Sequence, residues 1–259
     1  MSHALRRALA ACVMLGAACS DLTSVPGGPQ SLAIDSLPFT AVVVGDTLRD
    51  TLGVVRPLSA RVYDGANRLI VGAPVRFLTL DTGVVLDSVS GRLIGVRRRT
   101  GVRLLASVSG LQTTPKTIGV ANRPDTASNP DSVARLVYVT VPRTDPANSV
   151  SLRVKVGSQP LLPGTASADS VVEGWLVRFA VVRSPVNAVD TTQLTGGVAN
   201  SPWAVTDASG IATKVLRVVP TLGSRVRDTA SVQASITYKG LHVKGSPVTI
   251  VIPLAPKDS

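Results

Sequence analysis

The chain has few of the side chains that most catalytic and metal sites use. It contains two cysteines, two histidines and two methionines among 259 residues, and Glu173 is its only glutamate. Both cysteines, Cys12 and Cys19, lie close to the N-terminus, so the long remainder of the chain can hold no disulfide. Zinc sites of the usual Cys/His kind are excluded because their ligands are missing.

The same shortage argues against an enzyme. His3 lies in the leader described below, so a Ser-His-Asp triad could use only His242, and a solvent-facing histidine on a strand is the simpler interpretation. Most glycosidases need two converging carboxylates, and no stretch arranges Glu173 beside an aspartate. We therefore predict that the protein is not an enzyme and needs no cofactor or metal.

Residues 1–18 have the pattern of a secretory signal peptide. Arg6 and Arg7 give a positive start, residues 8–18 form an uncharged and mostly apolar run, and small residues close it. The run is too short to cross a bilayer as a helix, which needs about 20 apolar residues. We predict that the chain is exported.

The end of this run resembles a bacterial lipobox, in which a signal peptidase cuts before a cysteine that carries lipid. Ala17, Ala18 and Cys19 match the pattern, whereas Gly16 departs from it because a larger aliphatic residue is usual there. A second box at 9–12 matches better, but it leaves too few residues after the arginines for an apolar core. The resemblance implies that Cys19 becomes the lipid-modified N-terminus.

Two further expectations depend on this assignment. Ser20 follows the cysteine, and in Gram-negative lipoproteins such a residue goes with sorting to the outer membrane. The alternative is an ordinary signal peptide with Gly16 and Ala18 as its small-residue pair, which would leave Cys19 as a free thiol. We predict a lipid-anchored protein of the cell envelope, on its periplasmic or surface face.

The mature chain is cationic. Removal of Arg6 and Arg7 lowers the formal net charge from +11 to +9. Such a surface favours acidic polysaccharide, lipid phosphates or membrane headgroups as partners, whereas nucleic acid is not expected for an exported chain. Arg97, Arg98 and Arg99 form the densest cluster, which we interpret as the solvated end of a hairpin or as a ligand-binding patch.

From residue 31 onward the sequence predicts strands. Short valine-rich runs with apolar alternation are bounded by Gly, Pro, Asn, Asp and Ser, and no window keeps a helical stripe over about ten residues. Such spacing is typical of a sandwich or barrel, and the length favours two domains. We predict a tether at 19–30, a first domain at 31–121, a polar linker at 122–132 and a second domain at 133–256.

The two halves of the chain repeat each other. Three pairs of segments match in the same order: "GAPVRF" at 72–77 with "GWLVRF" at 174–179, "SGRLIG" at 90–95 with "SGIATK" at 209–214, and "ASVSG" at 106–110 with "ASITYKG" at 234–240. An ordered repeat of this kind indicates tandem copies of one fold, with longer loops in the second copy.

The segment "ARVYDGANRLIVGAPVRF", residues 60–77, resembles the middle of a bacterial immunoglobulin-like domain of the invasin/intimin type. In that family a strand ends in Asp, here Asp64, a turn with Gly65 follows, and the next strand carries a Pro-Val-x-Phe pattern. "TDASGIAT" at 206–213 resembles the family's Asp-x-x-Gly turn. The resemblance covers most of residues 30–256 and implies an all-β chain of two tandem immunoglobulin-like β-sandwiches.

Asp207 and Gly210 have a simple structural interpretation within "TDASGIAT". The Asp207 carboxylate can accept a hydrogen bond from the backbone two residues on, which makes an Asx turn, and Gly210 can adopt a positive φ. In the first half this turn is reduced to "DSVSG" at 87–91. A calcium loop is the alternative, but it needs several oxygens at close spacing and the stretch offers one carboxylate.

Aromatic residues make up only 3% of the chain, so each one is informative. Phe77 and Phe179 occupy matching places in the repeat, and we predict that both lie in cores. Trp175 lies in an apolar strand and is expected to be mostly buried, whereas Trp203 follows Pro202 in a predicted loop. Trp203 is the better candidate for stacking on a sugar, with core or strand-edge packing as the alternative for both tryptophans.

These features favour a non-catalytic envelope lipoprotein whose immunoglobulin-like modules act as a surface spacer, adhesion element or scaffold. Its expected partners are the membrane, through lipid on Cys19, and envelope proteins or acidic polysaccharide. The alternative is a surface glycan-binding lipoprotein in which Trp203, Arg97, Arg98 and Arg99 contact the ligand. The adhesion role follows from the resemblance, because a fold does not define a function.

Overall fold

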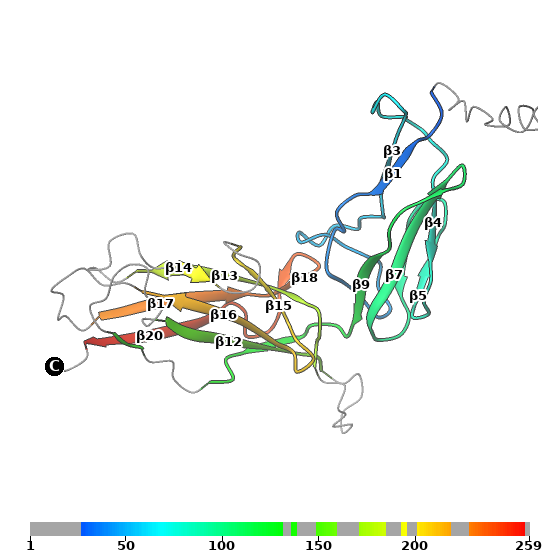
Figure 1. The fold of residues 1–259 in the computed structure, drawn as a ribbon. Helices are drawn as coiled ribbons and strands as arrows, with labels where there is room; N and C mark the ends of the chain where they lie inside the picture. Colours follow the sequence, from blue (N-terminus) through cyan, green and yellow to red (C-terminus); the bar gives the residue numbers. More distant parts are fainter. Residues whose placement is uncertain are drawn as a thin grey trace, which may run out of the picture.

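Strands are the only regular elements that the computed structural model contains in the ranges it describes, and they form two units joined end to end (Figure 1). Cys19 and the predicted signal peptide lie outside these ranges. The described residues are 27–131, 136–138, 149–159, 171–184, 193–195, 201–218 and 228–256.

The first unit is built around one sheet in the order β2-β9-β7-β4, with β8 paired to β7. Strands β2 and β9 are parallel, and the other neighbours in this sheet are antiparallel. Two smaller sheets, β1–β3 and β5–β6, complete the unit. The strands are β1 (Ser31–Ile34), β2 (Ala41–Val43), β3 (Ala60–Tyr63), β4 (Arg76–Thr79), β5 (Val84–Leu86), β6 (Leu93–Gly95), β7 (Arg99–Val108), β8 (Leu111–Gln112) and β9 (Lys116–Ala121).

The core of the first unit follows from alternation along its longest strand. Val102, Leu104 and Ala106 of β7 are fully buried and Arg103 is exposed, as expected for a period of two, while Leu105 on the other face of the strand is also buried, at 7% exposed. Ile34 of β1 and residues from β2, β4, β6 and β9 join the same buried cluster. The smaller sheets are therefore held to the main sheet by one shared apolar core.

The second unit has two larger sheets, in the orders β10-β12-β16-β14 and β11-β20-β17-β13-β15, and a small hairpin of β18 and β19. Only β11 and β20 are parallel within these sheets. The strands are β10 (Thr126–Ser128), β11 (Leu136–Tyr138), β12 (Ser149–Gly157), β13 (Leu176–Arg183), β14 (Gln193–Thr195), β15 (Trp203–Val205), β16 (Ile211–Arg217), β17 (Asp228–Ser235), β18 (Thr237–Tyr238), β19 (Leu241–His242) and β20 (Val248–Pro256).

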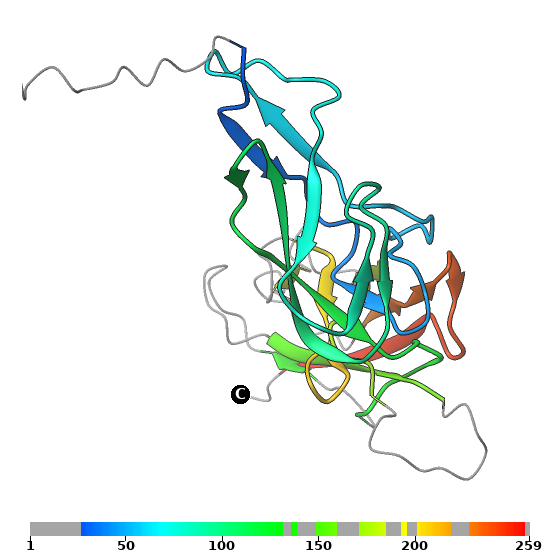
Figure 2. The same cartoon turned by 90° about the vertical axis from the view of Figure 1, so that its right-hand side faces the viewer.

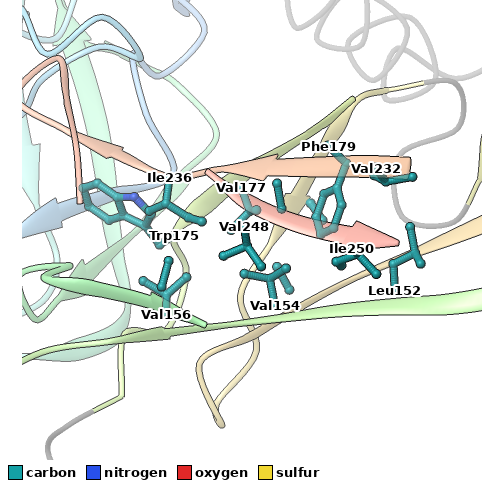
Figure 3. Packing of buried hydrophobic residues seen from close by; sticks show 14 of the residues in the cluster. Leu152, Val154, Val156, Trp175, Val177, Phe179, Val232, Ile236, Val248 and Ile250 are labelled. Carbon is teal, nitrogen blue, oxygen red and sulfur yellow. The ribbon is translucent and has the colours of Figure 1, made fainter. Parts of the chain in front are cut away.

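Side chains from the two larger sheets meet in one core (Figure 3). Leu152 and Val154 of β12 lie opposite Phe179 of β13, Val232 of β17 and Ile250 of β20, and all five are at most 3% exposed. Two packed sheets with inward-facing apolar residues define a β-sandwich. The predicted fold class, all-β with two tandem immunoglobulin-like sandwiches, is confirmed.

One strand lies inside the segment that the sequence suggested as a linker. Residues Thr126–Ser128, inside 122–132, form strand β10. This strand pairs antiparallel with β12, with Thr126 opposite Gly157. The segment lacks large apolar residues and carries two prolines, which is compatible with a short edge strand at the rim of a sheet. The second unit therefore starts at β10 in the structure.

The internal repeat is reproduced in the strand pairing. Phe77 of β4 faces Ala106 of β7, and Phe179 of β13 faces Ala234 of β17 at the same place in the second unit. Both phenylalanines are buried, at 6% and below 1% exposed, as the sequence predicted. The matching segments are thus the same two strands of one fold.

The two predicted aspartate turns are also equivalent. The Asp207 carboxylate accepts from the backbone N–H groups two and four residues on, at 2.8 and 3.0 Å, and Gly210 has a φ of +72°. Asp87 accepts from the N–H groups two and three residues on, both at 2.9 Å, and Gly91 has a φ of +70°. The Asx turn expected at Asp207 is confirmed, and the reduced segment "DSVSG" forms one as well.

The two units meet at an angle, and the described chain begins and ends at opposite poles of the pair. Figure 1 shows β1 near the pole of the first unit that is remote from the second, while β20 ends at the remote pole of the second unit. The view in Figure 2, turned by 90°, shows the same separation. A chain with this course spans the whole length of both units.

We predict that Gly91→Ala destabilises the first unit far more than Gly72→Ala. Both glycines have a positive φ, +70° and +75°, so each alanine carries a backbone strain of about 1–2 kcal/mol. At Gly91 the added Cβ would also lie 2.5 Å from the carbonyl oxygen of Leu58, whereas Gly72 has open space. Urea unfolding should show a loss of roughly 3 kcal/mol or more at Gly91. Equal losses for the two variants would contradict this account of the turn.

Candidate functional site at the junction of the two sandwiches

The arginine cluster lies beside the second unit. Arg97 and Arg98 occupy the turn between β6 and β7, and Arg99 begins β7. A guanidinium nitrogen of Arg98 lies 3.6 Å from the carboxylate of Glu173 in the second unit, so this cation crosses the junction. Arg99 is instead held within the first unit by Asp81, at 3.2 Å. The three neighbouring arginines therefore have different surroundings.

Trp203, the other predicted contact residue, begins the edge strand β15 rather than lying in a loop. It is half-buried and pairs in register with Arg178 of β13. Ala204 is buried while Val205 is exposed, so Trp203 and Val205 share the outward face of the strand. The structure thus places Trp203 in the second unit and does not bring it into direct contact with the arginine cluster.

An aromatic cluster joins the two units. Trp175, just before β13, is only 5% exposed, as expected from its apolar neighbours. Its ring lies 4.6 Å from the ring of Phe39 in the first unit and 6.1 Å from that of Tyr238. These distances and tilted ring planes suit favourable aromatic pairs. Figure 3 shows Trp175 at one end of the row of buried side chains, away from Phe179.

The apolar core of the second sandwich continues into the first unit. Ala41 and Val43 of β2 and Ala121 of β9 belong to the same buried cluster as Trp175, although they come from the first unit. Each of the three is at most 5% exposed. Separating the two units would therefore expose an indole ring and several aliphatic groups to water.

A charged network lies next to the aromatic cluster. Asp46 of the first unit accepts a hydrogen bond from the hydroxyl of Tyr238 at 2.7 Å and from Arg49 Nε at 2.9 Å. The ammonium group of Lys239 lies 3.4 Å from the same carboxylate. Tyr238 and Lys239, both from the second unit, thus make a charge-assisted bridge to this carboxylate of the first unit.

The network changes the acidity of both partners in the bridge. Burial alone would raise the pKa of Asp46, but the hydrogen bonds from Arg49 and Tyr238 outweigh it and hold the pKa well below its usual value. Burial and the adjacent Asp46 carboxylate raise the pKa of Tyr238 above its usual value. At neutral pH the bridge is therefore an ionised carboxylate that accepts from a protonated phenol.

Backbone contacts fix the two units more closely. Thr40 donates its hydroxyl to the carbonyl of Gly174 at 2.7 Å. The loop at Gly53 packs directly on the turn at Lys239 and Gly240, so closely that a Cβ on Gly53 would overlap the backbone of that turn. Asn122 donates its side-chain amide to the carbonyl of Val171 at 3.3 Å. These contacts come from several segments of both units, so the two units are joined by more than the linker between them.

A cleft of about 280 Å³ opens beside these contacts, between the two units. A cation and a carboxylate, Arg99 and Glu173, line it from opposite units, together with threonine side chains and apolar groups. We call this space the junction cleft and define it by Thr40, Arg99, Thr100, Thr117, Gly119, Val120, Glu173, Gly174, Val205 and Thr206.

The residues that make the junction were not found from the sequence, although the repeat held a signal for two of them. "GAPVRF" and "GWLVRF" differ only at their second and third positions. At the second position the first copy has Ala73 and the second copy has Trp175. "ASITYKG" is longer than "ASVSG", and the extra residues include Tyr238. The second copy therefore differs from the first at the residues that contact the neighbouring unit.

Solved structures of bacterial surface proteins match most of the chain at low identity. The adhesin InvE of Yersinia pseudotuberculosis matches 88% of this chain and 58% of its own, with 17% identity and a TM-score of 0.34. Domains 4 and 5 of the S-layer protein SbsC match 88% and 98%, with 8% identity and a TM-score of 0.30. Invasin, a bacterial integrin-binding protein, matches 87% and 39%, with 10% identity and a TM-score of 0.30.

An endo-fucoidan hydrolase of glycoside hydrolase family 107 also matches, over 88% of this chain and 34% of its own, with 13% identity and a TM-score of 0.34. Such likenesses concern the fold alone. No protein-family model matches the sequence, and a search of curated proteins finds no relative.

Within the described ranges, no group of three or more His, Cys, Asp or Glu side chains is placed to hold a metal ion. No helix in that part of the chain is long and apolar enough to cross a membrane.

Asp46→Asn should weaken the junction, by an amount that depends on pH. At neutral pH we expect the free energy of unfolding in urea to fall by about 1–2 kcal/mol, because a charge-assisted bridge in a partly hydrated site is lost. The folded-state pKa of Asp46 is lowered, so its contribution is complete above the unfolded pKa of about 3.9 and disappears as the pH falls below it.

The control is Asp35→Asn, which removes a partly exposed carboxylate paired with Arg61 at 2.7 Å on the same unit. Its effect should be smaller. The difference in unfolding free energy between wild type and Asp46→Asn should be constant from about pH 5 to 8 and should shrink below about pH 4. If this difference did not change with pH, or if Asp35→Asn lost as much stability as Asp46→Asn, the bridge would not couple the units.

Proposed function

We propose that this chain is a non-catalytic spacer of the bacterial cell envelope, anchored by lipid on Cys19, whose two sandwiches hold one fixed bend. The observation that carries the proposal is the junction. It combines a shared apolar core, the Asp46 bridge and direct backbone packing. Domains that touch only through a linker move freely, whereas a large apolar interface restrains them.

The course of the chain suits a spacer. The first unit follows the predicted tether at 19–30, so an anchor on Cys19 would put that unit next to the membrane. The second unit ends at the opposite pole of the pair (Figure 1). The remote pole of the second sandwich would then be the part presented farthest from the lipid.

The architecture also suits presentation to a partner at the cell surface. InvE is described as an adhesin and SbsC as an S-layer protein, and both are similar to this chain in fold over most of its length. We propose an adhesion or scaffold role on that basis, in the envelope and most simply at the outer membrane. Invasin is described as integrin-binding, and nothing of that partner is carried to this chain.

The absence of catalysis is part of the proposal and has its own test. Glu173, the only glutamate, is engaged by Arg98 at the junction, and His242 lies on the short strand β19 with its ring nitrogen 3.2 Å from the hydroxyl of Ser246. We expect the purified protein to release no reducing ends from fucoidan and to leave ester and peptide reporters intact. Turnover of any of these at an enzymatic rate would overturn the non-catalytic assignment.

Cys19→Ala should release the protein from membranes, whereas Cys12→Ala should not. Charge alone could hold a +9 chain on anionic lipid, but that attraction is screened at high salt, while an acyl anchor is not. We therefore expect the wild type and Cys12→Ala to stay in the membrane fraction after a high-salt wash and to incorporate labelled fatty acid. Cys19→Ala should appear in the soluble fraction without label. Retention of Cys19→Ala through the wash would contradict the anchor.

A further inference from the structure

The junction cleft lies beside the aromatic cluster and the Asp46 bridge rather than within them. The aromatic cluster and the Asp46 bridge lie at Phe39, Trp175, Tyr238 and Asp46, and none of these four side chains lines the cleft. Its volume of about 280 Å³ is close to the lower end of the range for small-molecule sites, about 300–1,000 Å³. Space of this size between two docked domains is a common place for a ligand.

The cleft offers groups that hydrogen-bond to sugars. The hydroxyls of Thr100 and Thr117 are on exposed residues of its first-unit wall. Gly119 and Gly174 also line the cleft. Glu173 on the opposite wall is already neutralised by Arg98 at 3.6 Å, so it does not make the cleft acidic.

A second feature continues the cleft along the outer face of the second sandwich. Val205 lines the cleft, and Trp203 lies two residues away on the same outward face of β15, about 7 Å along the strand. In register across the sheet, Trp203 faces Arg178 of β13, which faces Ser235 of β17. We call these three residues the outer row. It offers an aromatic ring, a cation and a hydroxyl side by side.

The charges around the cleft and the outer row favour an anion. At the cleft, Arg99 shares the single carboxylate of Asp81 with Arg103, and in the outer row the exposed Arg178 forms no ion pair within the described parts of the chain. The mature chain as a whole is also cationic. A ligand with spaced negative charges would therefore gain attraction at both ends of this surface.

We propose that the junction cleft and the outer row together bind a carboxylated glycan. One sugar ring would stack on Trp203 with its carboxylate toward Arg178, and the next would enter the cleft, within reach of the threonine hydroxyls and Arg99. Sugar rings stack on aromatic faces, and guanidinium groups pair with carboxylates. The proposal goes beyond the spacer function, because the spacer needs only the junction contacts.

The test uses the mature protein and oligogalacturonate, a chain of carboxylated sugars, with its methyl-esterified form as the neutral counterpart. Titration calorimetry and tryptophan fluorescence report binding, and Trp203 is the more exposed of the two indoles. We expect the free acid to bind and the methyl ester to bind at least about tenfold more weakly. Trp203→Ala and Arg178→Gln should each weaken binding of the free acid by about tenfold or more.

Arg153→Gln is the matched control for Arg178→Gln. It removes the same charge, and Arg153 lies on β12 in the opposite sheet. It should bind like the wild type, and all variants should unfold at the same urea concentration. No binding of the free acid, equal binding of the methyl ester, or an equal loss in Arg153→Gln would each overturn the proposal. None of these results would affect the anchor or the bend, which are measured separately.

Discussion

The burial of one indole ring, that of Trp175, is the constraint on which the arrangement of the two sandwiches depends. The ring lies at the end of the second core, where a sandwich has no further layer of its own to cover it, and Phe39 of the first unit supplies that cover at 4.6 Å. Because a large aromatic surface is removed from water only when the units are docked, the hydrophobic effect favours one relative orientation. The Asp46 bridge then selects among orientations by requiring a directed hydrogen bond from Tyr238.

Much of the fold could be predicted from the sequence, because the signals are local. Apolar alternation indicated the strands, and the side-chain oxygen of Asp207 indicated its turn, which the hydrogen bonds confirm. The ordered repeat also placed Phe77 and Phe179 correctly in two cores. In contrast, β10 was hidden in a polar segment, since a short edge strand needs little apolar surface.

The candidate site could not be predicted in the same way, because its partners are far apart in the chain. Asp46 and Tyr238 are separated by 192 positions, and nothing in the sequence pairs the two. Arg98 looked like part of a uniform basic cluster, yet its neighbour across the junction is the only glutamate. The useful signal is the difference between the two copies of the repeat: an aromatic residue that replaces a small one in the second copy marks the surface that meets a neighbour.

The central claim is that the two sandwiches form one rigid, bent body, and an electron–electron distance measurement tests it most directly. The mature chain without Cys19 has no native cysteine, so spin labels can be placed at Val71→Cys and Val251→Cys, two exposed positions on different units. A single narrow distance distribution is expected, and Phe39→Ala together with Asp46→Ala should broaden it by removing the cover and the bridge. A distribution that is already broad in the otherwise unaltered protein, and that the two substitutions leave unchanged, would contradict a fixed junction.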